Sequence, residues 1–461
     1  MKFRLLLPAI GMLLLPLQVA KADPIDRIVE RQMRQSSIPG SAVAVVEDGK
    51  VVKLRGYGTA AVEWNARVTP ETPFQLASGT KIFTGVLLMR LVERGEVRLD
   101  DSISRFFDGA PPTWQSITVR HLIHYTSGLP FIPGAAGGKT GAEVIAEAMK
   151  APLAYPTGSD SQYILTNMIV LKAILEKATG TSYEALLDRE IVKPLGLKST
   201  RYNQMVDQPG NMRVSEPVPG RAVVYSRDGQ RLIVREAAYN PASYAAGGLF
   251  SSVADLARLF VAIDSGTFLS KESVAALITP AVLSSGRPGG WAVGWTVRSY
   301  RGNTLVGHSG GPALSDVVRL PDRKLTVIVL TNTHYFYPLL AEAILDTYLP
   351  ARPPRVTLAD PAPDLTAKLM AALSSAEKGK LDTASFAEKA RGQAASYWDG
   401  FGQGYLAAMG MAHDARLVRE EKRGVMLIRT YAVRFSEREG FLEMSINPAG
   451  EIAGLYPVSE R

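Results

Sequence analysis

The chain has 461 residues, of which 46% are hydrophobic, 21% charged and 8% aromatic, and this is an ordinary composition for a globular protein. It excludes a disordered tail protein, a collagen-like fibre and a membrane protein with many spans. The formal net charge of +8 is a mild excess without a long basic run, so we expect no nucleic-acid partner.

The N-terminus has the pattern of a cleavable export signal. Lys2 and Arg4 precede an apolar run over residues 5–19, and residues 20–22 read Ala-Lys-Ala, with small residues where a signal peptidase reads them. The apolar run is shorter than the ~20 residues that span a bilayer, and prolines interrupt it. The sequence therefore predicts a signal peptide over residues 1–22 and a periplasmic or secreted product.

The chain contains no cysteine, so it offers no lipidation site after the signal, no disulfide and no thiolate chemistry. We therefore expect no stable membrane anchor after cleavage, and any nucleophile must be an oxygen or an amine. His121 and His124 have a spacing typical of metal ligands. No third ligand clusters with them, so a structural role is favoured and no metal or cofactor is expected.

After the signal, the predicted elements run from strands through helices back to strands. Two apolar runs around Asp48-Gly49 predict a hairpin over residues 41–58. A helix that is apolar on most sides is predicted over residues 78–93, and helices and loops dominate to about residue 265. Four strands are then predicted over residues 291–300, 304–308, 314–320 and 325–330, before a helix over 337–349. This order predicts an α+β fold, an antiparallel sheet flanked by helices with an inserted helical subdomain.

A proline-rich stretch over residues 351–364 predicts a linker, because five prolines fall between residues 350 and 364. Two helices are predicted beyond it, one near residue 365 and one over 386–409. Three strands follow, over residues 425–435, 441–446 and 452–458. We therefore predict a catalytic domain over residues 23–350 and a separate small α+β domain over residues 365–461, in which no catalytic pattern occurs.

Ser78-Gly79-Thr80-Lys81 forms an S-x-x-K tetrad at the start of the apolar helix. Residues three apart share a helix face, so the amine of Lys81 can reach the Ser78 hydroxyl. A helix N-terminus disfavours a charged lysine, and a partly desolvated lysine can act as the base that serine needs. A second such tetrad, at residues 375–378, lies on a polar helix end without this context. The buried setting therefore makes Ser78 the candidate nucleophile.

Residues 307–311 read Gly-His-Ser-Gly-Gly and allow two interpretations. As G-x-S-x-G they match the nucleophile elbow of α/β-hydrolases, which would make Ser309 the nucleophile. That elbow requires a helix after the serine and a later histidine, whereas a strand follows here, and His334 and His413 lie on a loop and in the tail domain. We therefore favour the other interpretation, in which an edge strand lines a cleft and its glycines let substrate approach the backbone.

Three elements in this order, Ser78–Lys81, Tyr163 and His308-Ser309-Gly310, resemble the serine β-lactamase and penicillin-binding-protein superfamily. The closer likeness is to its class C branch, which includes D,D-carboxypeptidases and esterases, and it covers residues from about 25 to 350. Further blocks such as SIPGSAVAVVEDGKVV, VRHLIHYTSGLP, AAGGLFSS and GWAVGW also look like that family.

The resemblance implies that Ser78 is the acylated nucleophile and that Lys81 and Tyr163 share proton transfer. It also implies that His308, Ser309 and Gly310 form the third element. The backbone N–H groups of Ser78 and Gly311 would then form the oxyanion hole, and such donors are commonly worth ~3–4 kcal/mol each in the transition state.

The chain departs from the family at Leu165, because the second element reads Tyr163-Ile164-Leu165 where relatives usually have Tyr-x-Asn. Leucine cannot bond the amide of an acylamino substrate, and a lost partner in a buried site costs ~1–3 kcal/mol. Asn167, one helical turn from Tyr163, is not treated as a replacement. His308 stands where relatives often carry lysine, and a histidine is mostly neutral at pH 7.

These departures favour a peptidase or an esterase over an efficient β-lactamase. The sequence predicts an exported serine acyl hydrolase that acts on an amide or ester, a small molecule or a peptide, with cell-wall peptide as one source. One alternative is a non-catalytic or weakly catalytic protein that binds cell-wall peptide or penicillin, which Leu165 keeps open. The other alternative is an α/β-hydrolase that uses Ser309.

Overall fold

The computed structural model describes residues 23–203, 205–206, 214–228, 231–235, 239–311, 314–333, 340–350, 357–423 and 425–458. The predicted signal peptide and His334 lie outside these residues. Within the described ranges, no helix combines the length and apolar character that a membrane span needs.

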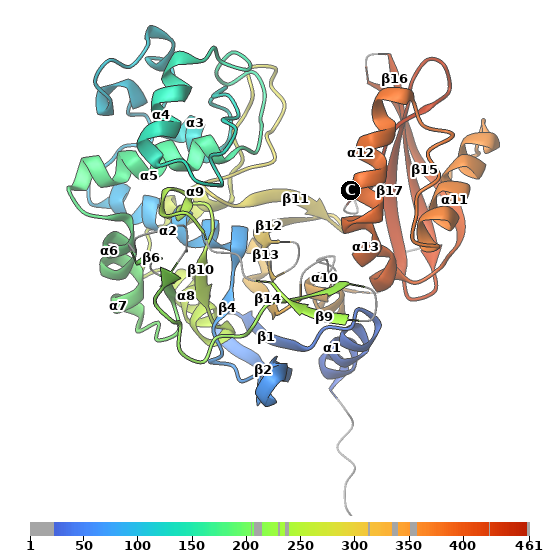
Figure 1. The fold of residues 1–461 in the computed structure, drawn as a ribbon, viewed down its shortest axis with the longest axis horizontal. Helices are drawn as coiled ribbons and strands as arrows, with labels where there is room; N and C mark the ends of the chain where they lie inside the picture. Colours follow the sequence, from blue (N-terminus) through green and yellow to red (C-terminus); the bar gives the residue numbers. More distant parts are fainter. Residues whose placement is uncertain are drawn as a thin grey trace, which may run out of the picture.

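The central element is an antiparallel sheet of seven strands in the order β11-β12-β13-β14-β1-β2-β3 (Figure 1). Its strands are β1 (Gly40–Glu47), β2 (Lys50–Ala61), β3 (Ala66–Arg67), β11 (Thr296–Tyr300), β12 (Asn303–Gly310), β13 (Ser315–Leu320) and β14 (Leu325–Thr331). β1 and β2 form the predicted hairpin, and its turn residues Asp48 and Gly49 have φ of +48° and +71°, as a tight hairpin turn requires. β1 also pairs with β14, so strands from the first and last parts of residues 40–331 meet at the centre of the sheet.

Each face of this sheet packs into its own apolar core, because successive residues of a strand point to opposite faces. The front face, with Val306 and Val317, packs against α2 (Thr80–Glu93) and α8 (Val253–Ser265). The back face, with Leu305 and Val318, packs against α1 (Pro24–Gln35) and α10 (Leu340–Leu345). The α2 helix is buried nearly all round, as its apolar sequence predicts, and it begins after a 3-10 turn at Ala77–Gly79.

The segment between β3 and β11 forms the helical part of the molecule, with α3, α4 and α5 at the upper left of Figure 1 and α6 and α7 below them. Its helices are α3 (Val119–Ile123), α4 (Gly141–Lys150), α5 (Leu165–Thr179), α6 (Tyr183–Leu187), α7 (Lys193–Leu195) and α9 (Lys271–Ile278). A small sheet is formed by β4 (Phe74–Gln75), β10 (Leu249–Ser251) and β5 (Arg201–Tyr202). Two short ribbons join β6 (Met205–Val206) to β7 (Val214–Ser215) and β8 (Tyr225–Asp228) to β9 (Arg231–Val234). This arrangement is the predicted α+β fold with inserted helices.

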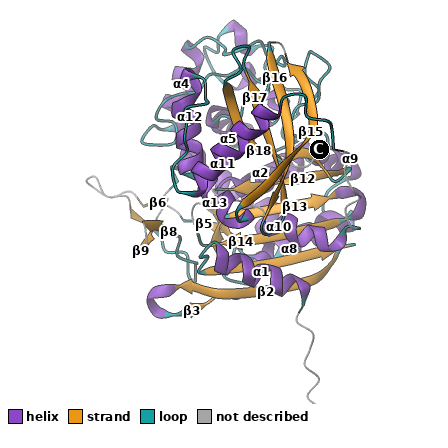
Figure 2. Cartoon of the chain, turned by 90° about the vertical axis from the view of Figure 1, so that its right-hand side faces the viewer, coloured by secondary structure: helices purple, strands orange, loops and turns teal. Residues whose placement is uncertain are grey.

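The C-terminal unit has three helices and a four-stranded antiparallel sheet in the order β15-β16-β17-β18 (Figure 2). The helices are α11 (Pro363–Glu377), α12 (Glu388–Asp399) and α13 (Phe401–Met409), and the strands are β15 (Ala412–Arg423), β16 (Met426–Phe435), β17 (Glu439–Ile446) and β18 (Ile452–Val458). The predicted helix over residues 386–409 is therefore two helices, because the backbone of Gly400 leaves the helical region. The polar edge strand β15 was not predicted, because half of its side chains are exposed, only one is buried and no apolar alternation marks it.

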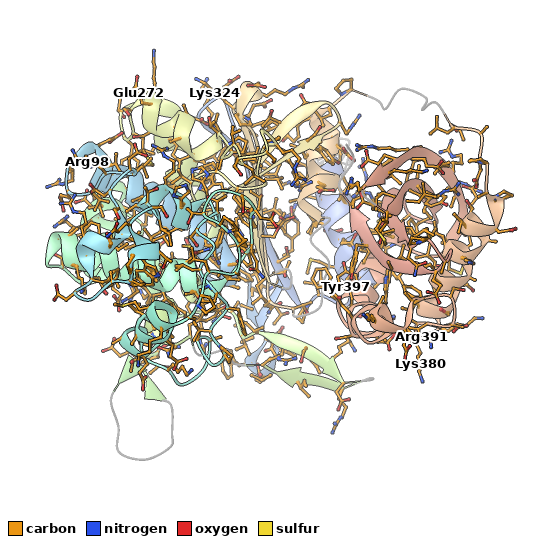
Figure 3. All side chains as sticks on the ribbon, turned by 90° about the horizontal axis from the view of Figure 1, so that it is seen from above. Arg98, Glu272, Lys324, Lys380, Arg391 and Tyr397 are labelled. Atoms are coloured by element: carbon orange, nitrogen blue, oxygen red, sulfur yellow. The ribbon has the colours of Figure 1, made fainter. Side chains whose placement is uncertain are left out.

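The C-terminal unit shares an apolar core with the back face of the main sheet. Trp398 and Tyr405 belong to the same buried cluster as Val29 and Val327, and α13 packs against α1. Charged side chains on the outer surface point away from both units, as Figure 3 shows for Arg98, Glu272, Lys324, Lys380 and Arg391.

Candidate active site

Ser78 lies in the 3-10 turn that leads into α2. Ala77, just before it, has φ of +47°, a left-handed conformation that costs a non-glycine residue about 1–3 kcal/mol. Neighbouring groups hold the turn in place, since Leu76 N donates to Leu249 O at 2.8 Å and Ser315 Oγ donates to Leu76 O at 2.6 Å. The fold therefore fixes the candidate nucleophile at the mouth of the helix.

Lys81 is the second residue of α2, one turn after Ser78, and only 3% of its surface is exposed. Its Nζ donates to the backbone oxygen of Ala246 at 2.6 Å and lies 4.9 Å from the centroid of the Tyr163 ring. Burial lowers the pKa of Lys81 to about 7. A large fraction of this lysine is therefore neutral near pH 7 and able to accept a proton.

Tyr163 is the side chain that contacts the Ser78 hydroxyl, because its Oη donates to Ser78 Oγ at 3.0 Å. It lies just before α5, and its ring stacks on Trp291 with a centroid distance of 4.9 Å and an angle of 16°. The ring of Tyr125, also 4.9 Å away, packs against the same pair. Burial raises the pKa of the Tyr163 phenol, and the hydrogen bond to Ser78 offsets part of that rise.

His308 lies in β12 on the same side of the sheet as Tyr163, with ring centroids 6.1 Å apart. Its Nδ1 donates to the backbone oxygen of Ser309 at 2.6 Å, which leaves Nε2 as an acceptor. Burial, together with the charge of Lys81, lowers the pKa of His308 to about 3, so the ring is neutral at physiological pH. Nε2 is buried and has no hydrogen-bond partner among the described residues.

The structure thus brings Ser78, Lys81, Tyr163 and His308 together in one place. Gly310 lies close to them as well. A Cβ atom added at Gly310 would be 1.8 Å from Leu76 O, so the end of β12 is in contact with the turn that carries Ser78. Gly311 follows β12 directly and is exposed.

The hydroxyl of Ser309 is engaged elsewhere, since it donates to Asp316 Oδ1 at 2.7 Å on the facing strand β13. Ser309 also lies inside a strand that turns back into another strand. The strand-to-helix turn of a nucleophile elbow is therefore not found at this serine.

Four residues at or beside the site escaped the sequence analysis. Trp291 was expected to begin a strand, but β11 starts only at Thr296, because the chain first turns through Gly294 with φ of +76°. Ala246 and Tyr125 lie in the AAGGLFSS and VRHLIHYTSGLP blocks, which marked their neighbourhood but not their roles. Asp316 had no signal, because only strand pairing places it beside Ser309.

The remaining predicted residues have structural partners. Leu165 is the first residue of α5 and packs on the front core, and Asn167 is fully buried and accepts from Ser127 Oγ. His121 Nδ1 caps α3 through Thr118, and His124 Nδ1 bonds the backbone oxygen of Trp291 at 2.8 Å. In the part of the chain that is described, no group of three or more His, Asp or Glu could hold a metal ion.

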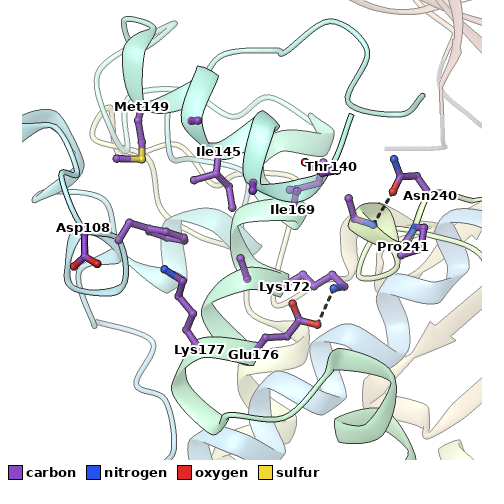
Figure 4. Close-up of a pocket in the computed structure, with 16 residues that line it drawn as sticks. Asp108, Thr140, Ile145, Met149, Ile169, Lys172, Glu176, Lys177, Asn240 and Pro241 are labelled. Atoms are coloured by element: carbon purple, nitrogen blue, oxygen red, sulfur yellow. Dashed lines mark hydrogen bonds and ion pairs between the residues drawn. The ribbon is translucent and has the colours of Figure 1, made fainter. Parts of the chain in front are cut away.

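A separate, largely apolar pocket of about 740 Å³ lies between α4 and α5, away from Ser78 (Figure 4). Two of the charged groups that line it, Lys172 and Glu176, pair with each other at 2.7 Å. None of the candidate catalytic side chains lines this pocket.

Comparisons with known proteins show which family and which fold this chain shares. Protein flp of Staphylococcus aureus (strain N315) is 26% identical over 212 residues, which cover 44% of this chain and 43% of that protein, so the chain spans less than half of this curated relative. The octameric penicillin-binding protein homologue from Pyrococcus abyssi matches with a TM-score of 0.61 at 23% identity, covering 95% of this chain and 98% of that one. EstCE1, a hydrolase with promiscuous acyltransferase activity, matches with a TM-score of 0.58 at 20% identity, covering 69% of this chain and 97% of that one.

At these identities the two structures establish a shared fold, and they confirm the predicted β-lactamase/transpeptidase-like architecture with a small C-terminal domain. The family model described as Beta-lactamase matches residues 25–348, which is well over half of the chain. The protein therefore belongs to the beta-lactamase family, within the serine β-lactamase and penicillin-binding-protein superfamily.

Proposed function

We propose that this protein is an exported serine hydrolase that forms an acyl-enzyme on Ser78. The observation that carries the proposal is the contact of 3.0 Å between Tyr163 Oη and Ser78 Oγ, beside a buried Lys81 whose pKa is lowered to about 7. A serine hydroxyl needs a base, and this arrangement supplies a relay and an acceptor.

In the proposed reaction, Ser78 Oγ attacks the substrate carbonyl carbon as its proton passes to Tyr163 Oη and the phenol's own proton passes to Lys81 Nζ. The pKa of Tyr163 is raised and that of Lys81 is lowered, so near pH 7 the phenol keeps one proton overall while the neutral lysine amine is available to gain one. The bond from the carbonyl carbon to the leaving group then breaks, and the leaving group takes the proton that Lys81 gained. Water next attacks the acyl carbon and gives up a proton through the same relay, the bond to Ser78 Oγ breaks, Ser78 regains its proton and the carboxylic acid leaves.

The backbone N–H groups of Ser78 and Gly311 are the proposed donors to the oxyanion. Gly310 supports this assignment, because its close packing on Leu76 and Gly79 brings the end of β12 against the nucleophile's turn. One such donor typically contributes ~3–4 kcal/mol to transition-state stabilisation.

The proposed substrate is an amide or ester, either a D-amino-acid peptide or a small ester, rather than a β-lactam. Leu165 offers no hydrogen bond to an acylamino group, and the neutral His308 offers no fixed charge. The fold shared with EstCE1, described as a hydrolase with promiscuous acyltransferase activity, is compatible with acyl transfer. The pattern of residues 1–22 supports export to the periplasm or beyond the cell.

Intact-mass analysis after treatment with a fluorophosphonate tests the proposal. We expect one adduct per chain, located on Ser78 and lost in Ser78→Ala. Ser375→Ala is the matched control, because Ser375 begins the other S-x-x-K tetrad and should leave labelling unchanged. A chain that takes up no adduct, or that is labelled equally well without Ser78, contradicts the proposal.

Leu165 also favours a second candidate, a protein that binds cell-wall peptide or penicillin with little or no turnover. Hydrolysis of short-chain nitrophenyl esters separates the two, because a pure binder leaves the ester intact. The α/β-hydrolase alternative requires that Ser309→Ala abolish activity while Ser78→Ala retains it.

A further inference from the structure

A buried carboxylic acid lies on the back face of the main sheet, in the strand next to the one that carries His308. Asp316, in β13, is 3% exposed and pairs with Ser309 directly across the strands. Its Oδ1 accepts from Ser309 Oγ at 2.7 Å, whereas its Oδ2 has no hydrogen-bond partner among the described residues. A buried carboxyl that is only half satisfied is costly and calls for an explanation.

Among the described side chains, none forms an ion pair with Asp316. The charged side chains that act on it are Glu342 of α10 and Arg298 of β11, and these two pair with each other at 2.8 Å. Burial is the main cause that raises the pKa of Asp316 to about 7. The hydrogen bond from Ser309 lowers this pKa by a smaller amount, and the opposite effects of Glu342 and Arg298 are smaller still. The hydrogen bond from Ser309 is therefore the main polar contact that this acid makes.

Ser309 is held from both faces of the sheet. On the back face its hydroxyl donates to Asp316, and on the front face its backbone oxygen accepts from His308 Nδ1 at 2.6 Å. The next residue, Gly310, packs against Leu76 O and Gly79 N in the turn that carries Ser78. A shift of Ser309 would therefore be transmitted to the imidazole and to the nucleophile's turn together.

We propose that Asp316 is a positioning residue, which through its hydrogen bond to Ser309 fixes the end of β12 against the Ser78 turn and the His308 ring. This inference rests on the proposed function of Ser78. Asp316 does not touch substrate in this assignment. Its effect is on position, because a displacement of a catalytic group by about 1 Å can lower the reaction rate by about two orders of magnitude.

The test compares Asp316→Val, Asp316→Asn and Ser309→Ala in the full chain, with a fluorophosphonate and a nitrophenyl butyrate as probes. Valine suits a buried strand but removes the acceptor, whereas asparagine keeps an oxygen in the position of Oδ1. We expect Asp316→Val and Ser309→Ala each to lower kcat and the labelling rate about ten-fold with little change in KM. We expect Asp316→Asn to recover most of the loss.

Coupling distinguishes positioning from a general loss of stability. The double variant Asp316→Val/Ser309→Ala should be no slower than the slower single variant, because both changes remove one hydrogen bond. All variants should still reach one adduct per chain on Ser78. Asp322→Asn, an exposed carboxyl just beyond the other end of β13, is the matched control and should behave as wild type.

Three results would overturn the proposal. Asp316→Val could label as fast as wild type, the two single losses could multiply in the double variant, or Asp316→Asn could be as slow as Asp316→Val. Each of these leaves the proposed function intact if wild type still labels on Ser78. A wild-type chain without an adduct on Ser78 is a different result, and it rejects both the proposed function and the role of Asp316.

Discussion

The chain contains the S-x-x-K pattern twice, and the two copies lie in opposite environments. Ser78 and Lys81 lie at the start of α2, where the lysine is 3% exposed and the serine contacts a phenol. Ser375 and Lys378 lie at the end of α11, where the lysine is exposed and Ser375 Oγ donates to Ala372 O one turn back. The same four-residue pattern therefore has a buried lysine with a lowered pKa at Ser78 and an exposed lysine at Ser375. Substitutions in the two copies should differ in their effects for this reason.

The largest expected effect is the loss of the nucleophile. Ser78→Ala should lower kcat for a nitrophenyl ester by on the order of 10⁴-fold or more, because no other group can form the acyl-enzyme. Ser375→Ala should leave kcat unchanged. Equal effects of the two substitutions would remove the distinction between the tetrads.

Removal of the buried amine should have the next largest effect. Lys81→Met keeps the apolar volume of the side chain and removes the proton acceptor, so we expect kcat/KM to fall roughly 10²–10⁴-fold. In wild type, kcat/KM should rise with pH around a midpoint near 7, since only the neutral amine accepts a proton and its pKa is about 7. Lys378→Met should change neither the rate nor this midpoint.

Tyr163→Phe removes the group that contacts Ser78 Oγ and preserves the stack on Trp291. We expect kcat to fall about 10²-fold, because general acid–base groups typically contribute at least that much. The folded structure should be retained, which near-ultraviolet circular dichroism can verify. Full activity in this variant would mean that Lys81 serves Ser78 without a relay.

The burial of Lys81 should also make the free energy of unfolding depend on pH. Burial lowers its folded-state pKa from 10.5 to about 7, so between these values the unfolded chain binds a proton that the folded chain does not. The free energy of unfolding should therefore gain up to about 1.4 kcal/mol per pH unit from this group as pH rises through that window. Urea titrations of Lys81→Met should lack this contribution, whereas those of Lys378→Met should retain it.

The smallest effect is expected from Trp291→Leu. This change removes the ring stacked on Tyr163 and leaves in place the groups that transfer a proton in the proposed reaction. An aromatic pair is worth about 0.5–1.5 kcal/mol, so we expect kcat/KM to fall by roughly ten-fold or less. Steady-state kinetics with the nitrophenyl ester measures this. A loss as large as that of Tyr163→Phe would assign the indole a more direct part in the reaction.

Local patterns predicted much of the fold. The hairpin around Asp48-Gly49 and the apolar α2 helix have periodicities that short windows reveal, and the order of elements gave the α+β architecture. The polar strand β15 and the break at Gly400 were missed, because their signals depend on what packs against them.

The sequence motifs predicted the main residues of the candidate site but not the contacts among them. Ser78, Tyr163 and His308 lie far apart in sequence, and the structure brings them together. The stack of Trp291 on Tyr163 and the bond between Ser309 and Asp316 were not predictable, because each depends on tertiary or strand contacts that no local pattern encodes.

The pairing of β1 with β14 has a consequence for when the candidate site forms during folding. Ser41 lies opposite Thr331, and Asn332 Oδ1 accepts from Gly40 N at 2.7 Å, so the sheet closes only when segments nearly 300 residues apart meet. Contacts of such high sequence separation slow folding, because a long loop must close before they form. Ser78 therefore emerges early in synthesis, whereas β12 and β14 follow much later, and the candidate site is complete only after these distant strands have joined the sheet.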